Sequence, residues 1–563
     1  MKRHGGQAGL RDIRPVTFWL LVAAVIGVRC LIGWLQMAYV WVDGAPLDDE
    51  LMFRAAVSIR EGNWLGGYDW LTLSKHMFFA IWLAFCNLVG LPYLVAGQFL
   101  VCLSSLAASF AVRPLLKRRL HQLLLFVLLA FQPATTAAFT LRVYRDNIFP
   151  SLCMLFFAGM CGYALRVHSP LKKGLPWLLL AGVGLATAWL CREDGIWLLP
   201  FALVGGVVLA ILAILEQKTL AQRCKRIAVL LVPFGVLAAG IGAYSGMNQA
   251  VYGVFTVSDF SSGSFSEAMG AMNRVKPQQW KPLVSVPQEV RQELYQAVPL
   301  LQPLEYWLEE DADLQNSYRN PGLHDYQAGS FYWAIRKAAW MEGVYESPQT
   351  ADRYWSQVAE QINQLCDTGA LPSQGGKRVG TTPPFRMEYL VPVLQETVAS
   401  LWHTITFQDC QPYMTIRSIG QVEDLAVWED FLHQKTNHAA AAGQDAPYYN
   451  SVQKMVFGAL ELVRYAYVAL LVVGLVLAVV LQVQKAMALA KSKATLGDWL
   501  PWILLLGLLG MALMRCAMIA FMEVAAFQIG TYVMYLSTVH PLLVLYSGVS
   551  ILSVWRNEHW QNS

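Results

Sequence analysis

Residues 16–50 read VTFWLLVAAVIGVRCLIGWLQMAYVWVDGAPLDDE, an apolar run that ends in three consecutive carboxylates. The apolar part, 16–42, is longer than the roughly 20 residues that an α-helix needs to cross a bilayer. Asp48, Asp49 and Glu50 therefore lie at the mouth of a predicted membrane span. Acidic groups in that position indicate a role in chemistry or binding for Asp48 and Asp49, whereas simple solvation is the stronger alternative for Glu50.

The rest of the chain has the composition of a polytopic membrane protein. Apolar residues make up 56% of the 563 residues and charged residues only 14%, which is too apolar for an ordinary soluble enzyme. Because lipid forces every backbone polar group to be satisfied within its own segment, each span is predicted to be helical. The fold class is mainly α, with about ten transmembrane helices over 16–42, 92–112, 121–141, 147–167, 175–191, 196–215, 227–245, 456–482, 499–520 and 532–555.

Two apolar segments do not fit a simple span. The stretch 77–90 is too short and is expected to form an interfacial or re-entrant helix. The last segment is interrupted by His540-Pro541. The first segment follows basic residues, as a signal peptide does, but its apolar run is too long and no small-residue cleavage site follows, so we expect a retained anchor.

The basic residues of the loops orient the spans. Nineteen fall on one side: Lys2, Arg3, Arg11, Arg14, Arg113, Lys117, Arg118, Arg119, Arg166, Lys172, Lys173, Lys218, Arg223, Lys225, Arg226, Lys485, Lys491, Lys493 and Arg556. Six fall in the short loops of the other side. The positive-inside rule then predicts an inner or plasma membrane protein with both termini in the cytoplasm. The net charge of +4 reflects this topology and does not indicate nucleic-acid binding.

Three regions follow from this topology. Residues 1–245 form a transmembrane catalytic module of seven spans with an outer loop at 43–76. Residues 246–455 are less apolar and predict a mostly helical extracytoplasmic domain, and residues 456–563 hold the last three spans. Cys366 and Cys410 lie in the predicted external region, where a disulfide and two free thiols are equally compatible with the sequence.

The charged residues of the short loops should gather on the outer face. They are Asp48, Asp49, Glu50, Lys75, His76, Arg142, Arg145, Asp146, Arg192, Glu193 and Asp194. A carboxylate can take a proton from an acceptor hydroxyl or hold a divalent cation. Arginine can neutralise a leaving phosphate through two parallel hydrogen bonds, which lysine cannot do. The cluster therefore suits a reaction on a lipid-linked phosphate ester.

Each group also has a structural interpretation. Arg145-Asp146 and Arg192-Glu193-Asp194 can be ion pairs that close helix ends, and Lys75-His76 can anchor a helix at the interface. Arg515, near the outer end of the ninth span, can meet a lipid phosphate or snorkel to the interface. Arg29, in the middle of the first span, should face the bundle interior. Trp307, Trp333, Trp340 and Trp355 are expected to be core residues.

The order of these elements resembles the GT-C superfamily of membrane glycosyltransferases, which includes protein O-mannosyltransferases and the lipid A aminoarabinose transferase. The matching text is DDELMFRAA at 48–56, EGNW at 61–64, KHMFF at 75–79 and GLP at 90–92. Arg145-Asp146 corresponds to the second acidic loop of the family. The resemblance covers about the first 200 residues. The chain has Met77-Phe78 where Pro-Pro is common, and the 246–455 block matches no module of the family.

The resemblance implies inverting transfer of a sugar from a polyprenyl-phosphate donor to an extracytoplasmic glycan, lipid or protein acceptor. Asp49 or Asp48 is then the general base or a cation ligand, with Asp48, Asp49 and Asp146 as ligands if Mg²⁺ or Mn²⁺ is used. Arg145, together with Arg192 and Arg515, would hold the donor phosphate.

Two other functions compete with this one. A transporter or lipid flippase also needs charges in the membrane, but it predicts inverted repeats and charges near the bilayer midplane. A non-enzymatic anchor that presents the external block leaves the charged clusters of three separate loops without a purpose.

Overall fold

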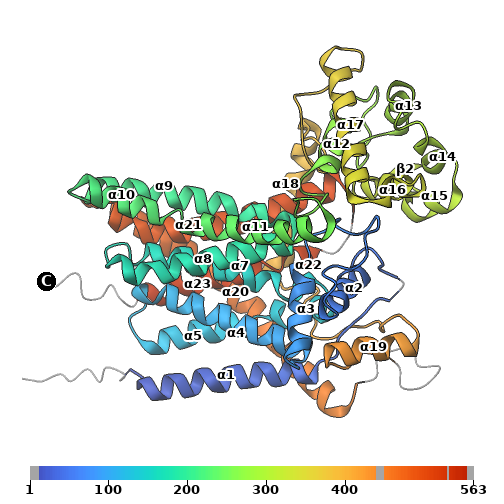
Figure 1. Ribbon diagram of the computed structural model, residues 1–563. Helices are drawn as coiled ribbons and strands as arrows, with labels where there is room; N and C mark the ends of the chain where they lie inside the picture. Colours follow the sequence, from blue (N-terminus) through green and yellow to red (C-terminus); the bar gives the residue numbers. More distant parts are fainter. Residues whose placement is uncertain (1–11, 43, 439–448, 529–531, 555–563) are drawn as a thin grey trace, which may run out of the picture.

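The computed structural model describes residues 12–42, 44–438, 449–528 and 532–554. Long helices run side by side in a bundle, and short helices gather at one end of it (Figure 1). The helices of the bundle are α1 Pro15–Leu35, α4 Tyr93–Ala111, α5 Arg119–Ala130, α6 Ala138–Leu141, α7 Phe149–Ala164, α8 Leu171–Cys191, α9 Leu199–Glu216, α10 Leu220–Val229, α11 Val232–Tyr252, α20 Ser451–Lys491, α21 Leu496–Ala525, α22 Tyr532–Leu536 and α23 Val539–Val554.

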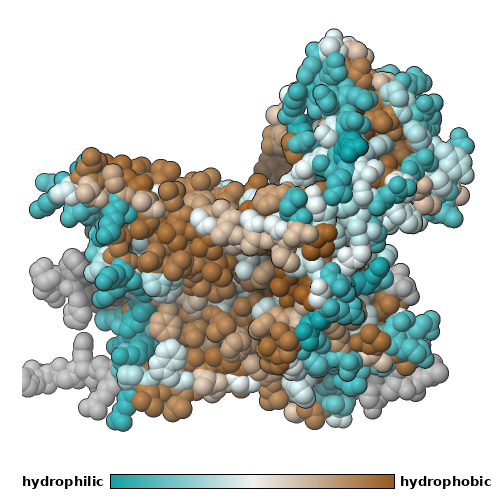
Figure 2. Space-filling model, viewed as in Figure 1, coloured by the Kyte–Doolittle hydropathy of each residue, from teal (hydrophilic) through white to brown (hydrophobic). Residues whose placement is uncertain are grey.

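The bundle confirms the predicted polytopic helical fold. In the described part of the chain, eight helices are long and apolar enough to cross a membrane, or nine if the bent pair 119–130 and 133–141 is one span. Apolar side chains form a broad band over the bundle, and polar side chains gather at its ends and on the short helices (Figure 2). Such a band is what the hydrocarbon core of a bilayer requires of a protein surface.

Three predicted spans differ in detail. The first ends at Leu35 and not at 42, because Ala38 and Tyr39 are extended and pair with Thr436 and Arg142. The span at 121–141 is bent by 55° at a break after Ala130, and its second part begins at Pro133. The last segment is divided between α22 and the 16-residue α23, and the division falls before His540-Pro541 rather than at it.

Proline and glycine explain where several helices begin and how closely they pack. The helices α7, α9 and α11 each have proline in the first turn, where a missing N–H costs nothing. At Gly159 a Cβ atom would lie 2.3 Å from the backbone nitrogen of Ala181, and at Gly184 2.4 Å from that of Phe156. These glycines let α7 and α8 approach closely. The start of α7 and the end of α8 are thereby brought to the same end of the bundle.

That end, which we call the site end, also carries two short helices, α2 Asp49–Arg60 and α3 Phe78–Leu88 (Figure 1). The 11-residue α3 is the short helix expected near 77–90. The first helix begins, and α23 ends, at the opposite end, where the loop between α4 and α5 and the basic helix α10 also lie (Figure 1).

A mostly helical lobe projects from the site end. It consists of α12 Ser264–Met272, α13 Gln288–Ala297, α14 Leu304–Glu309, α15 Ala312–Tyr318, a two-stranded antiparallel ribbon of β1 Arg319–Asn320 and β2 Asp325–Tyr326, α16 Ala328–Met341 and α17 Pro348–Asp367. Trp355 is 1% exposed and Trp333 7%, but Trp340 is 41% exposed and so is not the core residue predicted. Cys366 and Cys410 are buried free thiols.

Two helices of the predicted external block belong with the bundle instead of the lobe. The helix α18, Leu390–Ile405, packs along α21, and α19, Val422–Leu432, packs against α3. The side chains of Val391, Leu394, Val398 and Trp402 on α18 are each more than half exposed. An exposed apolar face on a helix that joins a membrane bundle indicates contact with lipid.

Candidate functional site

The extended strand after α1 places Arg142 against the first turn of α2. Tyr39 N–H donates to the Leu141 carbonyl at 2.9 Å, and Val143 N–H donates to the Tyr39 carbonyl at 3.0 Å. Arg142 Nε then lies 2.9 and 3.0 Å from the two carboxylate oxygens of Asp49, whose side chain is fully buried. Burial raises the pKa of Asp49 to about 6, while the Arg142 guanidinium acts in the opposite direction.

Asp48 lies beside this pair but faces outward. Its carboxylate contacts Lys75 Nζ, accepts a hydrogen bond from Tyr144 Oη at 2.8 Å and lies 3.9 Å from Arg142 Nη2. Partial burial alone would raise the pKa of Asp48, but Lys75 and Arg142 outweigh it and hold that pKa well below its usual range. The Asp48 side chain is 39% exposed, so an ionised carboxylate is open to a ligand here.

Arg145 and Glu193 continue the network from Tyr144. Arg145 Nη2 donates to Tyr144 Oη at 2.8 Å, and its Nη1 lies 2.7 Å from Glu193 Oε2. The other oxygen of Glu193 accepts the His76 backbone N–H at 3.0 Å. The His76 ring, 2% exposed, contacts the Trp189 carbonyl and Ser261 Oγ. Burial lowers the pKa of His76, so the ring is neutral near pH 7.

The sequence neighbours of Arg145 and Glu193 form a second group of ion pairs. Arg192 Nη1 lies 2.6 Å from Asp146 Oδ1, and Arg192 Nε lies 3.0 Å from Asp194 Oδ1. Arg515, from the middle of α21, lies 2.7 Å from Asp194 Oδ2. The Arg515 side chain is fully buried. It therefore contacts Asp194 from within the protein, and the interpretation of Arg515 as a residue that snorkels to the interface is wrong.

The structure thus brings all the sequence-predicted site residues into one place, with Glu50 at its edge. Within the described residues, we call the following set the charge cluster: the basic side chains Lys75, Arg142, Arg145, Arg192 and Arg515 and the carboxylates Asp48, Asp49, Asp146, Glu193 and Asp194. Five positive charges face five negative ones. Glu50 is outside the cluster and lies 3.9 Å from Arg54 on its own helix.

Several residues of the site were not predicted from the sequence. The Tyr144 ring lies between two guanidinium groups, at 4.9 Å from that of Arg142 and 5.0 Å from that of Arg145. Lys75 Nζ lies 5.3 Å from the ring centre of Trp333 in the lobe. Tyr144 stands between two arginines in the sequence and could have been noticed, whereas nothing in the sequence links Trp333 to Lys75.

The carboxylates of the cluster do not fit a divalent-cation site as they stand. Asp48 and Asp49 each contact a basic side chain, and Asp146 is held by Arg192. Among the residues that the structure describes, no three His, Cys, Asp or Glu side chains are grouped so that they could hold a metal ion.

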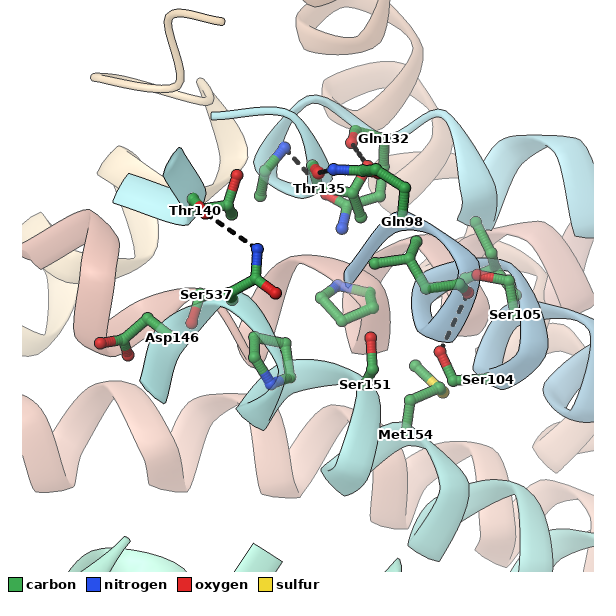
Figure 3. Close-up of a pocket in the computed structure, with 16 residues that line it drawn as sticks. Gln98, Ser104, Ser105, Gln132, Thr135, Thr140, Asp146, Ser151, Met154 and Ser537 are labelled. Carbon is green, nitrogen blue, oxygen red and sulfur yellow. Dashed lines mark hydrogen bonds between the residues drawn. The ribbon is translucent and has the colours of Figure 1, made fainter. Parts of the chain in front are cut away.

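A small cavity lined by both polar and apolar side chains lies beside Asp146 in the bundle (Figure 3). Its volume is about 30 Å³, which is room for one or two water molecules. Gln98, Ser151 and Ser537 line it. Arg29 contacts Gln98 and lies 3.0 Å from Thr135 Oγ1, also in the lining, so this buried cation faces the bundle interior as predicted.

Comparison with known proteins adds little to this description. No protein-family model matches the chain, and no curated protein matches it. Among solved structures, the chain is similar to ArnT from Cupriavidus metallidurans in the apo state, with 12% sequence identity over 96% of this chain and 78% of that chain. The TM-score of this match is 0.29. So low a score establishes neither a shared fold nor a shared activity, and the chemistry of the site therefore rests on the chain's own residues.

Proposed function

We propose that this chain is an integral-membrane glycosyltransferase that moves a sugar from a polyprenyl-phosphate donor to an acceptor hydroxyl. One observation carries the proposal: Asp48, the most exposed carboxylate of the charge cluster, contacts Lys75 and Tyr144, and Tyr144 in turn contacts Arg145. A carboxylate that can act as a base and two cations that can bind a phosphate therefore belong to one network. The exposed apolar face of α18 offers a surface for the lipid chain of the donor. This face belongs to a helix that packs on α21, and α21 carries Arg515 of the charge cluster.

The cations and the carboxylate have different roles in an inverting transfer. Lys75 and Arg145 bind the donor phosphate and neutralise the charge that develops on it as the bond from the sugar to the phosphate oxygen breaks. Asp48 accepts the proton of the acceptor hydroxyl while the new bond forms at the opposite face of the anomeric carbon. The products are the glycosylated acceptor and the polyprenyl phosphate, and the proton is left on Asp48.

The ion pairs of the cluster couple donor binding to proton transfer from the acceptor hydroxyl to Asp48. Lys75 is now paired with Asp48, and Arg145 with Glu193. A donor phosphate that takes over Lys75 removes one of the two cations, Lys75 and Arg142, that hold the pKa of Asp48 down. The Asp48 carboxylate then becomes a stronger base when the donor is in place. Asp49 is sealed by Arg142 and fully buried, so it positions Arg142 and does not reach an acceptor.

We place the site end outside the cytoplasm. The basic helix α10 and the basic loop between α4 and α5 lie at the opposite end of the bundle, where the positive-inside rule expects the cytoplasm. This orientation puts the lobe and the acceptor on the extracytoplasmic side of the plasma membrane.

The test is transfer of label in membrane vesicles. Vesicles that contain the protein are supplied with a panel of polyprenyl-phosphate sugars carrying a radiolabelled hexose or aminopentose. We expect one donor to release its label to the acceptor fraction, Asp48→Asn to abolish release, and Glu50→Gln to preserve it. Glu50 is a matched control because it lies two residues away, outside the cluster. Release that survives in Asp48→Asn, or no release from any donor, would overturn the proposal.

A further inference from the structure

A second, larger cavity lies where the lobe meets the bundle. Its volume is about 330 Å³, within the roughly 300–1,000 Å³ typical of small-molecule sites. It is lined by the loop between α2 and α3, the end of α11, the loop that follows α11 into the start of α12, and the first turns of α17. The chain turns sharply out of α11 at Gly253, which has a φ of 75°. The loop from 254 to 263 is thus directed along the cavity.

The lining has the chemistry of a carbohydrate site. Asp259 and Asp352 supply carboxylates, and Thr256, Ser262 and Ser264 supply hydroxyl groups. Carboxylates accept hydrogen bonds from neighbouring hydroxyls, and serine and threonine can both donate and accept them. Phe255, also in the lining, is 64% exposed. An exposed aromatic ring beside hydrogen-bonding groups offers an apolar face on which a sugar ring can pack.

The charges of the lining select against anions. None of the lining residues, all of which the structure describes, is basic. Arg336, fully buried behind the cavity, is 2.7 Å from Asp259 Oδ2 and holds that carboxylate in place. A phosphate or a uronic acid would meet two carboxylates and no free cation. A neutral sugar, or one that carries an amine, would meet favourable partners.

The cavity and the charge cluster share one loop. Ser262 Oγ donates to the Ser258 carbonyl at 3.2 Å, while the neighbouring Ser261 contacts His76 Nε2 at 2.7 Å. Asp259 N–H donates to the Leu73 carbonyl at 2.8 Å, two residues before Lys75. The 254–263 loop therefore lines the cavity and also contacts His76 and Leu73, which lie next to Lys75 in the sequence.

We propose that this cavity is a subsite for a neutral or amine-bearing glycan portion of the acceptor, an inference that rests on the proposed transferase function. The glycan packs on Phe255 and hydrogen-bonds to Asp352 and Asp259. The hydroxyl that receives the new sugar extends past the 254–263 loop toward Asp48.

The experiment measures glycan binding by the purified full-length protein in nanodiscs. The probe is an array of one- to four-residue glycans in neutral, amine-bearing, uronic-acid and sulfated forms. We expect binding to neutral or amine-bearing members only. Phe255→Ala should weaken it about fivefold, and Asp352→Asn about tenfold. Tyr306→Ala, at a 53% exposed aromatic residue on α14 of the lobe, is the control and should bind as the parent does.

The outcome is separable from that of the proposed function. Asp48→Asn should bind the same glycans with unchanged affinity although it transfers nothing. Binding without any transfer by the parent protein would leave the subsite standing and refute the transferase. No binding by any array member, a preference for acidic glycans, or affinity that Phe255→Ala and Asp352→Asn do not change would overturn the subsite.

Discussion

Two buried networks of arginine and carboxylate lie in different parts of this molecule. In the lobe, Arg291 lies 2.6 Å from Glu309 and 2.7 Å from Asp325, and none of the three side chains is more than 8% exposed. At the site end the pairs are equally short, but Asp48 is 39% exposed and Glu193 28%. The same ion-pair chemistry is sealed in one region and open in the other. Openness to a ligand, and not the ion pair itself, distinguishes a site from a structural brace.

The largest effect on activity is expected from a change in the open network at the site end. Asp48→Asn removes the proposed base, which in general contributes about 10²–10⁴-fold to a rate. Because the carboxylate is partly exposed, the fold should survive the change. Initial rates of sugar transfer measure the loss of activity, and the melting temperature in the same membranes shows whether the fold is kept. A variant that keeps the parental rate, or that loses its fold, contradicts the assigned role.

The sealed network should respond in the opposite way. Arg291→Met leaves the buried carboxylates of Glu309 and Asp325 without the cation that they share, which costs about 3–5 kcal/mol when a buried pair is broken. Protease resistance of the lobe should fall, while the rate per folded molecule stays unchanged. If the stability of the lobe were unaltered and transfer were lost instead, the sealed network would have to be counted as part of the site.

Arg145→Lys tests whether the guanidinium geometry matters. Lysine keeps the charge but cannot contact both Tyr144 and Glu193 through a rigid fork. Loss of one hydrogen bond to a charged group, worth about 1.5–3 kcal/mol, predicts at least a tenfold rise in the KM for the donor. The KM for the acceptor should not change. An equal change in both constants would argue against a donor-phosphate role.

The pH dependence separates Asp48 from Asp49. The pKa of Asp49 is about 6, so as the pH falls through 6 this carboxylate is protonated and its hold on Arg142 weakens. Asp48 stays ionised over the same range, because its pKa lies well below the usual value. Transfer should therefore fall below pH 6, to about a tenth of its plateau at pH 5. In Arg142→Lys the midpoint should move, and a rate that is flat from pH 8 to pH 5 would contradict this account.

Much of the fold could be predicted because membrane spans have a strong sequence signal. Length and apolar content located the long helices, and the topology indicated that Arg145 and Arg192 share an end of the bundle. The failures have local causes. Residues 36–42 are mostly apolar yet not helical, since their backbone pairs with residues far away in the chain, Arg142, Ile419 and Thr436. The α18 helix has only 16 residues and lies in a block of lower hydropathy, so the sequence there has no signal of a span.

The site was predicted in its charged residues but not in its geometry. Sequence alone could not tell that Asp49 would be sealed and Asp48 open, because the difference arises from Arg142, which is 93 residues away. Nor could it place Trp333 beside Lys75, or Arg515 on Asp194. These contacts join segments that are far apart in the chain, and neither periodicity nor spacing carries that information.

In the proposed mechanism, Lys75 and Arg145 bind the donor phosphate beside Asp48. The most direct test is a cryo-electron microscopy structure of the protein in nanodiscs with a non-hydrolysable polyprenyl-phosphonate sugar. We predict that the phosphonate lies between Lys75 Nζ and the Arg145 guanidinium, with Asp48 released from Lys75 and facing the anomeric carbon. A phosphonate bound away from both cations, with Asp48 still closed on Lys75, would contradict the account.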